Sequence, residues 1–441
     1  MISTRASVAG AAACLAALAG CATFSETIQS TERSLAQQQP KLALAEYEKH
    51  RPGSADQVLY LMNRGMLLRM VGDYGQSTST LEEAKNLIDN LRAVSLSEQA
   101  LSITVNDSAR SFIGEDFEQV MVHAYLALNF LEQRRLDAAR VEALQADLLL
   151  RQGAQGALIR PYTEDAFTRY LTGIVYEDQR EWSDAMIAYR KAYEAYQAQT
   201  SRFGVPVPET LKHDLIRLAD RMGLSQEAER YRKSFGIKDT PSVEALAETG
   251  EIVLTVHAGL APAKREHSVT VVNPNTGRLL RLALPSYHSR GDPLAYARVI
   301  VESLSATSSQ VANIDAIAIK SLEARMPAIT ARAVARMIAK DSVAKAAAGD
   351  GRSSGQALAG LAVNIAAVLT ERADTRSWFT LPGEIHLARI SLPPGNYRGR
   401  IELYGRGGGL MQSSDFQVAL AKGEKRYMSR HWVPGNIEVR P

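Results

Sequence analysis

The first half of the chain places its apolar residues at the spacing of amphipathic helices. From Pro40 to about Ile237, apolar side chains recur at i, i+3 and i+4 within segments rich in Ala, Leu, Glu, Gln and Arg. This periodicity brings the apolar residues of each segment onto one helical face, which needs a neighbour to cover it. The spacing therefore predicts an all-helical domain over residues 40–240.

The periodicity changes after Thr240-Pro241, where apolar and polar residues begin to alternate as they do in β-strands. Strands are predicted at residues 251–257, 268–272, 278–284, 384–392, 397–404 and 415–421. The turn residues 273–277 join two of these strands into a β-hairpin. Helical patterns lie between the strands, at residues 314–325, 329–348 and 356–371.

These patterns predict a mixed α+β domain over residues 245–441, with a β-sandwich-like sheet and a helical hairpin. Pro327 is expected to begin the second helix of this region. Ala357–Leu369 is apolar except for Asn364, and its 13 residues are too few to cross a bilayer. We therefore expect a buried helix that covers the sheet, within an α+β multidomain chain.

Three stretches of the helical half fit the 34-residue tetratricopeptide pattern, in which small residues lie where two helices cross and aromatic residues fill the gaps. The first copy has Gly65, Gly72-Asp73-Tyr74, Leu81 and Ala84, the second has Leu126, Ala127, Phe130, Ala139, Ala143 and Ala146, and the third has Gly173, Tyr176, Trp182, Ala185, Tyr189 and Ala192. A looser helix pair covers residues 208–235, and an insertion separates the first two copies. The pattern predicts a tetratricopeptide-like solenoid.

Such a solenoid presents a curved surface made by the first helix of each pair, and this surface suits an extended or helical segment of another protein. The side chains expected on it are Met62, Met66, Arg69, Met70, Leu128, Leu131, Tyr170, Ile174 and Glu177. Methionines suit an adaptable binding surface, but they fill cores equally well. Two interpretations therefore stay open, a partner-binding groove and ordinary helix packing.

The first 21 residues resemble a bacterial lipoprotein signal. Arg5 is followed by the apolar residues 8–18, and the small residues Ala19-Gly20 precede Cys21. The resemblance implies that residues 1–20 are removed and that Cys21 carries acyl chains, which hold the protein on a lipid bilayer. Residues 21–39 would then be the lipidated cysteine and a short polar tether.

Composition adds three limits to this picture. The other cysteine, Cys14, lies in the segment expected to be removed, so the mature chain has no internal disulfide. The net charge is +3 and there is no block of Lys and Arg, so we expect no nucleic-acid partner. No apolar run reaches the ~18 residues of a transmembrane helix.

The chain also resembles a family of uncharacterised tetratricopeptide-repeat-containing lipoproteins of Gram-negative bacteria. The segments that carry the resemblance are Thr104-Val105-Asn106-Asp107 with Gly114-Glu115-Asp116-Phe117-Glu118 and the following residues 125–130, then residues 169–177, and residues 373–382. They span most of the mature chain. The resemblance implies the location and the domain layout, with a loose association with envelope and peptidoglycan assembly, and it implies no biochemical activity. Ala22 after the cysteine resembles lipoproteins sorted to the outer membrane, facing the periplasm.

Two polar clusters are candidates for chemistry. In the insertion at residues 106–118, Glu115 and Asp116 precede an apolar helix, where they suit either helix capping or acid-base catalysis. In the second cluster, Asp374, Arg376 and Trp378 are expected on one side of an extended strand. They suit either an ion pair beside a core tryptophan or a contact surface for a protein or glycan.

Other motifs are set aside. Residues 351–355 match G-x-S-x-G, but the residues before them are helical in pattern, whereas a nucleophile elbow follows a strand. The eight histidines are scattered and no H-E-x-x-H occurs, so we expect no metal and no cofactor.

The sequence thus favours a non-enzymatic lipoprotein of the cell envelope that binds another protein through the solenoid groove, as a scaffold or activator. Two alternatives remain. One is an envelope enzyme acting on glycan or peptide, with Glu115, Asp116 or Asp374 as its acid or base. The other is a structural component that assembles with itself.

Overall fold

A computed structural model of the chain describes residues 24–98, 110–155, 164–273, 277–291, 294–348 and 354–435. The predictions for the signal segment and Cys21, for residues 106–109 of the insertion, for the centre of the turn at 274–276 and for Gly351-Arg352-Ser353 lie outside these residues.

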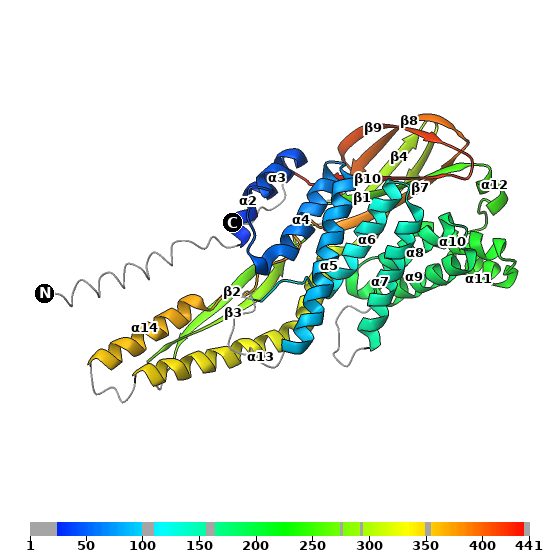
Figure 1. Cartoon of the computed structure of the whole chain (residues 1–441). Coiled ribbons are helices and arrows are strands. Elements are labelled where there is room, and N and C mark those ends of the chain that lie inside the picture. The colour runs from blue at the N-terminus through cyan, green and yellow to red at the C-terminus, as the bar shows by residue number, and fades with distance from the viewer. Residues whose placement is uncertain are drawn as a thin grey trace.

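The helical half consists of successive antiparallel pairs (Figure 1). Two N-terminal helices, α2 (Phe24–Ala36) and α3 (Pro40–Tyr47), are followed by a 3-10 turn, η1 (Ser54–Asp56). The pairs are α4 (Gln57–Met70) with α5 (Tyr74–Glu98), α6 (Asp116–Glu132) with α7 (Leu136–Gln155), α8 (Ala166–Asp178) with α9 (Trp182–Phe203), and α10 (Glu209–Arg221) with α11 (Ser225–Phe235). A short helix, α12 (Val243–Ala247), leads to the sheets.

The small residues of the repeat pattern lie where the helices of a pair cross. A Cβ on Gly65 would lie 2.6 Å from the Leu81 side chain, and a Cβ on Gly173 would overlap the Tyr189 ring. Only glycine allows this close approach. The packing role predicted for these positions is confirmed.

Two four-stranded sheets form a β-sandwich. The inner sheet has the order β10-β1-β7-β6 and the outer sheet has the order β5-β4-β8-β9. Strands β1 and β10 are parallel, and the other neighbours are antiparallel. The strands are β1 (Gly250–Ala258), β4 (Tyr296–Val301), β5 (Leu304–Thr307), β6 (Ser309–Asn313), β7 (Glu384–Leu392), β8 (Gly395–Tyr404), β9 (Leu410–Leu420) and β10 (Lys425–Trp432).

The inner sheet is buried on both faces. Along β1, Ile252, Leu254 and Val256 pack into the core of the sandwich, whereas Val253 belongs to the core shared with the helices. Successive side chains of a strand point to opposite faces, so one strand serves both cores. The molecule therefore has three layers, which are the helix pairs, the inner sheet and the outer sheet.

An arm projects from this body (Figure 1). It contains the hairpin of β2 (Ala263–Val272) and β3 (Leu279–His288), and the helices α13 (Ile314–Ala348) and α14 (Ser354–Thr370). The two helices expected on either side of Pro327 are a single helix, α13, with the proline inside it. Both helices of the arm contact β3.

Three further expectations need correction. Residues 24–36 are a helix and not an extended tether, because Ile28 and Leu35 are buried in a cluster with Phe379 and Val433. The segment 371–378 forms no strand. Helix α14 is covered on one side only, since Gly360 and Asn364 are buried while Leu361 and Ile365 are exposed.

The change of pattern near residue 240 falls at the connection that holds α12, but the hydrophobic core continues across it.

Candidate functional site

The surface predicted as an open groove is covered by the inner sheet of the same chain. Its side chains lie on the first helices of the pairs and are buried, except for Met70, which is half-buried: Met62, Met66, Arg69, Leu128, Leu131, Tyr170, Ile174 and Glu177. Helix α6 contacts β10, and α8 contacts β6. The prediction of an open groove is wrong, because the sandwich occupies the face that a separate partner would need.

Arg69 shows how closely the helices and the sheet are joined. Its guanidinium donates hydrogen bonds to Asn129 on α6 and to the Ser429 hydroxyl on β10. It also lies 5.2 Å from the ring centre of Tyr74 and 5.7 Å from that of Tyr125. A buried arginine that hydrogen-bonds to two other elements, α6 and β10, and lies over a ring of a third, α5, fixes them relative to one another.

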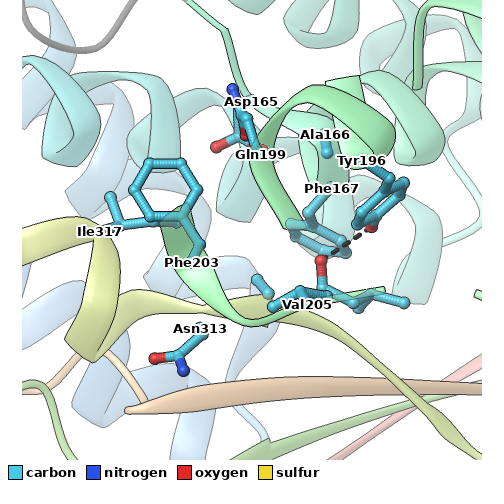
Figure 2. A pocket seen from close by; sticks show the side chains of 11 residues that line it. Asp165, Ala166, Phe167, Tyr196, Gln199, Phe203, Val205, Asn313 and Ile317 are labelled. Atoms are coloured by element: carbon cyan, nitrogen blue, oxygen red, sulfur yellow. Dashed lines mark hydrogen bonds between the residues drawn. The ribbon is translucent and has the colours of Figure 1, made fainter. Parts of the chain in front are cut away.

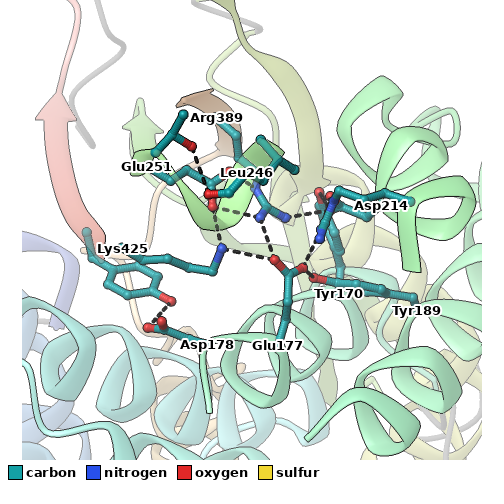
Figure 3. A network of polar contacts seen from close by, with 12 residues as sticks. Tyr170, Glu177, Asp178, Tyr189, Asp214, Leu246, Glu251, Arg389 and Lys425 are labelled. Carbon is teal, nitrogen blue, oxygen red and sulfur yellow. Dashed lines mark hydrogen bonds and ion pairs between the residues drawn. The ribbon is translucent and has the colours of Figure 1, made fainter. Parts of the chain in front are cut away.

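A buried network of charged side chains forms a second junction (Figure 3). Arg389 on β7 contacts three carboxylates, with nitrogen–oxygen distances of 2.6 Å to Asp214, 2.7 Å to Glu251 and 3.2 Å to Glu177. Two of these carboxylates belong to helices α8 and α10 and one belongs to β1. Arg389 therefore joins the helix pairs to the inner sheet.

Glu177, predicted as a partner-binding residue, accepts contacts from inside the molecule. Lys425 Nζ lies 2.9 Å from it, Arg217 Nη2 lies 2.6 Å from it, and the Tyr189 hydroxyl donates a hydrogen bond of 2.5 Å. Tyr170 has a similar role, since its hydroxyl donates to Asp214 over 2.8 Å. Both side chains are part of the junction between α8, α10 and the sheet.

The charges of this network stabilise one another. Burial opposes ionisation of Glu177, but Arg217, Lys425 and Arg389 outweigh it and hold its pKa well below the usual range. Burial is likewise outweighed at Glu251, where Arg389 and Lys425 lower the pKa to about 2. Burial disfavours the charged form of Arg389, yet the three carboxylates raise its pKa well above the usual value. The network therefore stays ionised at neutral pH.

A pocket of ≈ 810 Å³, part of it open to solvent, lies beside this network. Charged side chains line it, together with Trp182, Leu246 and Ala247. Arg221 stacks over the Trp182 ring at 4.0 Å from its centre. The buried charges of the lining, Glu177, Arg217, Glu251, Arg389 and Lys425, are paired with one another, as expected of a structural junction.

A second, smaller pocket of ≈ 300 Å³ lies where α8 and α9 meet β6 and α13 (Figure 2). Phe167, Phe203 and Ile317 make it largely apolar, and the Tyr196 hydroxyl donates to the Val311 carbonyl over 2.8 Å. Among the residues that the structure describes, no group of His, Cys, Asp and Glu is placed to hold a metal ion. In the same part of the chain, no helix has the length and apolar character of a membrane span.

Glu115 and Glu118 cap helix α6. They form a capping box, in which each side chain accepts from the backbone of the other. Glu115 is buried and lies 2.9 Å from Lys264 Nζ, and Arg325 also pairs with it. Burial opposes its ionisation, but the two cations lower its pKa. The capping interpretation is confirmed, with Glu115 as the N-cap and Asp116 in the first turn.

The pKa of Glu118 is shifted in the opposite direction to that of Glu115, because burial dominates at Glu118. Its Oε1 accepts from the Trp378 backbone N–H over 2.7 Å, and its Oε2 accepts from the Glu115 N–H over 2.7 Å. Burial and the neighbouring Glu115 raise its pKa to about 7. Glu118 lies in the core, and it holds the 373–382 segment against α6.

The Asp374 cluster is an ion pair beside a core tryptophan. Asp374 Oδ2 lies 2.8 Å from Arg376 Nη2, and Arg376 Nη1 lies 2.9 Å from Asp56. Trp378 is fully buried. The packing interpretation is confirmed for these residues, and the alternative of an exposed contact surface does not fit the burial of Arg376 and Trp378.

Sequence reasoning missed the residues that join the two halves, which are Arg389, Lys425, Asp214 and Lys264. Arg389 is separated from Glu177 by 212 residues, and Lys264 from Glu115 by 149. No local spacing reveals a pair that the fold brings together from such a distance.

Comparisons with known proteins add little. No family model matches the sequence, and no curated protein matches it. The crystal structure of MamA is 15% identical, with a TM-score of 0.30, over 48% of this chain and 92% of that chain. The apo form of RapI is 10% identical, with a TM-score of 0.34, over 46% of this chain and 49% of RapI. Both are tetratricopeptide-type repeat proteins.

A third solved structure is the Rap conjugation gene regulator of the plasmid pLS20 in complex with the Phr* peptide. It is 13% identical, with a TM-score of 0.29, and the match covers 48% of this chain and 54% of that chain. This chain thus spans about half the length of the Rap proteins.

Proposed function

We propose that this protein is an outer-membrane lipoprotein, anchored through Cys21 and facing the periplasm, that serves as a protein-binding scaffold in assembly of the cell envelope. The lipoprotein signal at residues 1–21 supports the anchor. The observation that carries the scaffold role is an exposed apolar stripe on helix α7, on the side of the helix pairs away from the sheet.

The stripe consists of Val141, Leu144 and Leu148, which are 52%, 41% and 47% exposed. Their spacing of i, i+3 and i+7 places them on one face of the helix. The opposite face of α7 is buried through Ala139 and Ala143. An exposed stripe of this kind fits the apolar face of a helix from a partner protein, packed ridge into groove.

The test is affinity purification from crosslinked envelopes with the tagged native lipoprotein. The Leu144→Glu, Leu148→Glu double variant adds charge to the stripe without disturbing buried groups. The matched control is Leu42→Glu, because Leu42 is an exposed leucine on another helix, α3. The scaffold proposal requires a partner that is retained by the control and lost by the double variant. Equal recovery with both variants contradicts a role for the stripe.

A Cys21→Ser form tests the anchor separately, because it cannot be acylated. The proposal requires that the native form stay with the membrane fraction and that Cys21→Ser be released. Arg69 and Tyr170 are unsuitable for testing partner binding, since both are buried in the junction and their substitution alters the fold.

The geometry does not favour the enzymatic alternative at Glu115 and Asp374. Glu115 is held between Lys264 and Arg325, and Asp374 pairs with Arg376. A carboxylate whose pKa is lowered by such partners is a poor proton donor or acceptor near neutral pH.

A further inference from the structure

The arm formed by β2, β3, α13 and α14 exposes apolar side chains that the body does not cover. Helix α14 contains no charged residue, and its outward side chains include Leu361 and Ile365, which are 56% and 43% exposed. On α13, Ile338 is 59% and Val343 is 61% exposed. A helix that is apolar on its outward side is normally covered by something.

The hairpin of the arm has the same character. Val269 lies opposite Leu282 and Val271 lies opposite Leu280, so these pairs share one face of the two-stranded sheet. Both valines are 51% exposed. Within the described residues β2 pairs with β3 alone, and the apolar surface of the arm is thus present on its strands as well as on its helices.

The arm is also more positive than the chain as a whole. Residues 265–286 and 325–372 contain ten Lys and Arg against four Asp and Glu, an excess of six positive charges, whereas the whole chain has a net charge of +3. One of the ten, Arg325, is balanced by Glu115 of the body. The acidic residues described there are paired with cations of the arm, Glu266 with Arg281, Asp341 with Arg278, and Glu371 with Lys340. The arm is therefore both apolar and cationic.

These two properties together fit the surface of an anionic bilayer, where apolar side chains enter the boundary of the acyl chains and cations lie at the headgroups. A second copy of the arm fits poorly, because the two positive surfaces repel each other. Neither described helix of the arm is long and apolar enough to span a bilayer, so the contact is interfacial.

The position of the arm agrees with this. Its base is joined to α2, where Arg290 Nη2 lies 2.6 Å from Glu32 in a buried ion pair. Helix α2 begins at Phe24, three residues after Cys21, and three residues reach roughly 11 Å when extended. If the anchor of the proposed function is present, the arm begins close to the membrane. The arm projects on the side of the body where α2 begins (Figure 1).

We propose that the arm is a membrane-contact element, which lies on an anionic lipid surface through the exposed side chains of α13, α14 and the β2–β3 hairpin. It gives the protein a second, non-covalent attachment that limits how the body is oriented. The charge and exposure of the arm carry this inference without the acyl anchor.

The test places an environment-sensitive dye on single cysteines at Ile338 or Leu361, in the full chain with Cys14→Ser and Cys21→Ser. The control position is Ile187 on α9, which is 49% exposed and lies outside the arm. Any attachment by the N-terminal segment is common to all three proteins. Vesicles of phosphatidylethanolamine with phosphatidylglycerol are compared with vesicles of phosphatidylcholine alone.

The arm dyes should shift to shorter wavelength on the anionic vesicles, while the dye at Ile187 should not. Lys345→Gln with Arg372→Gln should weaken the binding measured by the arm dyes roughly twenty-five-fold, since each basic residue near such a surface contributes about a factor of five. No shift at either arm position, or an equal shift at Ile187, overturns the proposal. A concentration-dependent shift without vesicles also overturns it, because the occupant is then a second copy. Acylation of Cys21 and capture of a partner are measured separately, so failure of this inference is distinguishable from failure of the proposed function.

Discussion

Replacement of Arg389 by Met measures how strongly the charge network holds the inner sheet against the helices. The substitution keeps a long apolar side chain but removes a guanidinium that contacts Asp214, Glu251 and Glu177. The side chain of Arg389 is only 8% exposed, and the carboxylates it contacts are similarly buried. Three carboxylates then remain with two cations, Arg217 and Lys425.

The cost follows from this loss of balance. Removing one partner of a buried ion pair costs about 3–5 kcal/mol, because an uncompensated charge stays buried. A domain is stable by only about 5–15 kcal/mol, so the change should be large in any unfolding experiment. We expect Arg389→Met to lower the free energy of unfolding by about 4 kcal/mol, with the buried carboxylates as the cause.

The assay is urea unfolding followed by tryptophan fluorescence, since Trp378 is buried in the core between the helices and the sheet. The matched control is Arg400→Met. Arg400 lies 3.1 Å from Asp415, but their side chains are 55% and 80% exposed. Such a surface pair contributes about 0–1 kcal/mol. The reasoning is refuted if Arg389→Met loses no more stability than Arg400→Met.

Three further predictions concern other parts of the fold. Gly173→Ala should lower the free energy of unfolding by about 1–3 kcal/mol, because the added Cβ overlaps the Tyr189 ring. Gly53→Ala, whose added Cβ meets no atom within 4 Å, should have little effect. Urea unfolding of both variants checks this, and equal midpoints contradict it. Asn364→Ala should lower the free energy of unfolding by about 1–3 kcal/mol and raise hydrogen exchange at the Leu279 amide. The reason is that the Asn364 side chain accepts a hydrogen bond from Leu279 N (3.0 Å) and donates one to Leu279 O (2.8 Å). Unchanged exchange at that amide contradicts the prediction. The pKa values of Glu177 and Glu251 are lowered in the folded protein, so the stability that these carboxylates contribute is complete above their unfolded pKa of about 4.3 and is lost as the pH falls toward 2. The urea midpoint should therefore decrease over this pH range, and it should decrease less in Arg389→Met. The same decrease in both proteins rules out the network as its source.

Periodicity and small-residue spacing predict the helix pairs of the first half and part of the sheet in the second half. The helical spacing predicts the helix pairs, and Gly65 and Gly173 mark where helices cross, because close packing there excludes any side chain. Alternation predicts β1, β7, β8 and β9 of the sandwich, but it did not reveal β4, β5, β6 and β10. The capping role of Glu115 was also predictable, because a carboxylate just before an apolar helix commonly caps it.

The arrangement of the two halves was not predictable in this way. A first-helix face with Met66, Tyr170 and Ile174 has the same composition whether it binds a partner or its own sheet. What holds the sheet against this face is the set of ion pairs of Arg389 and Lys425, whose partners are far away in the sequence. The exposed side of α14 was also missed, because an apolar segment predicts a buried helix and the sequence does not show which of its sides the rest of the chain covers.

The central claim is that the inner sheet of the chain fills the face formed by the first helices of the pairs. Cysteine accessibility in the native protein tests it most directly, with single cysteines at Met66 and Ile174, both fully buried, and at Leu144, which is exposed on the opposite side of the helix pairs. With the sheet in place, a maleimide should label Leu144→Cys rapidly and should label Met66→Cys and Ile174→Cys only after denaturation. Rapid labelling of 66 and 174 in the folded protein contradicts it, because the groove is then open to a partner.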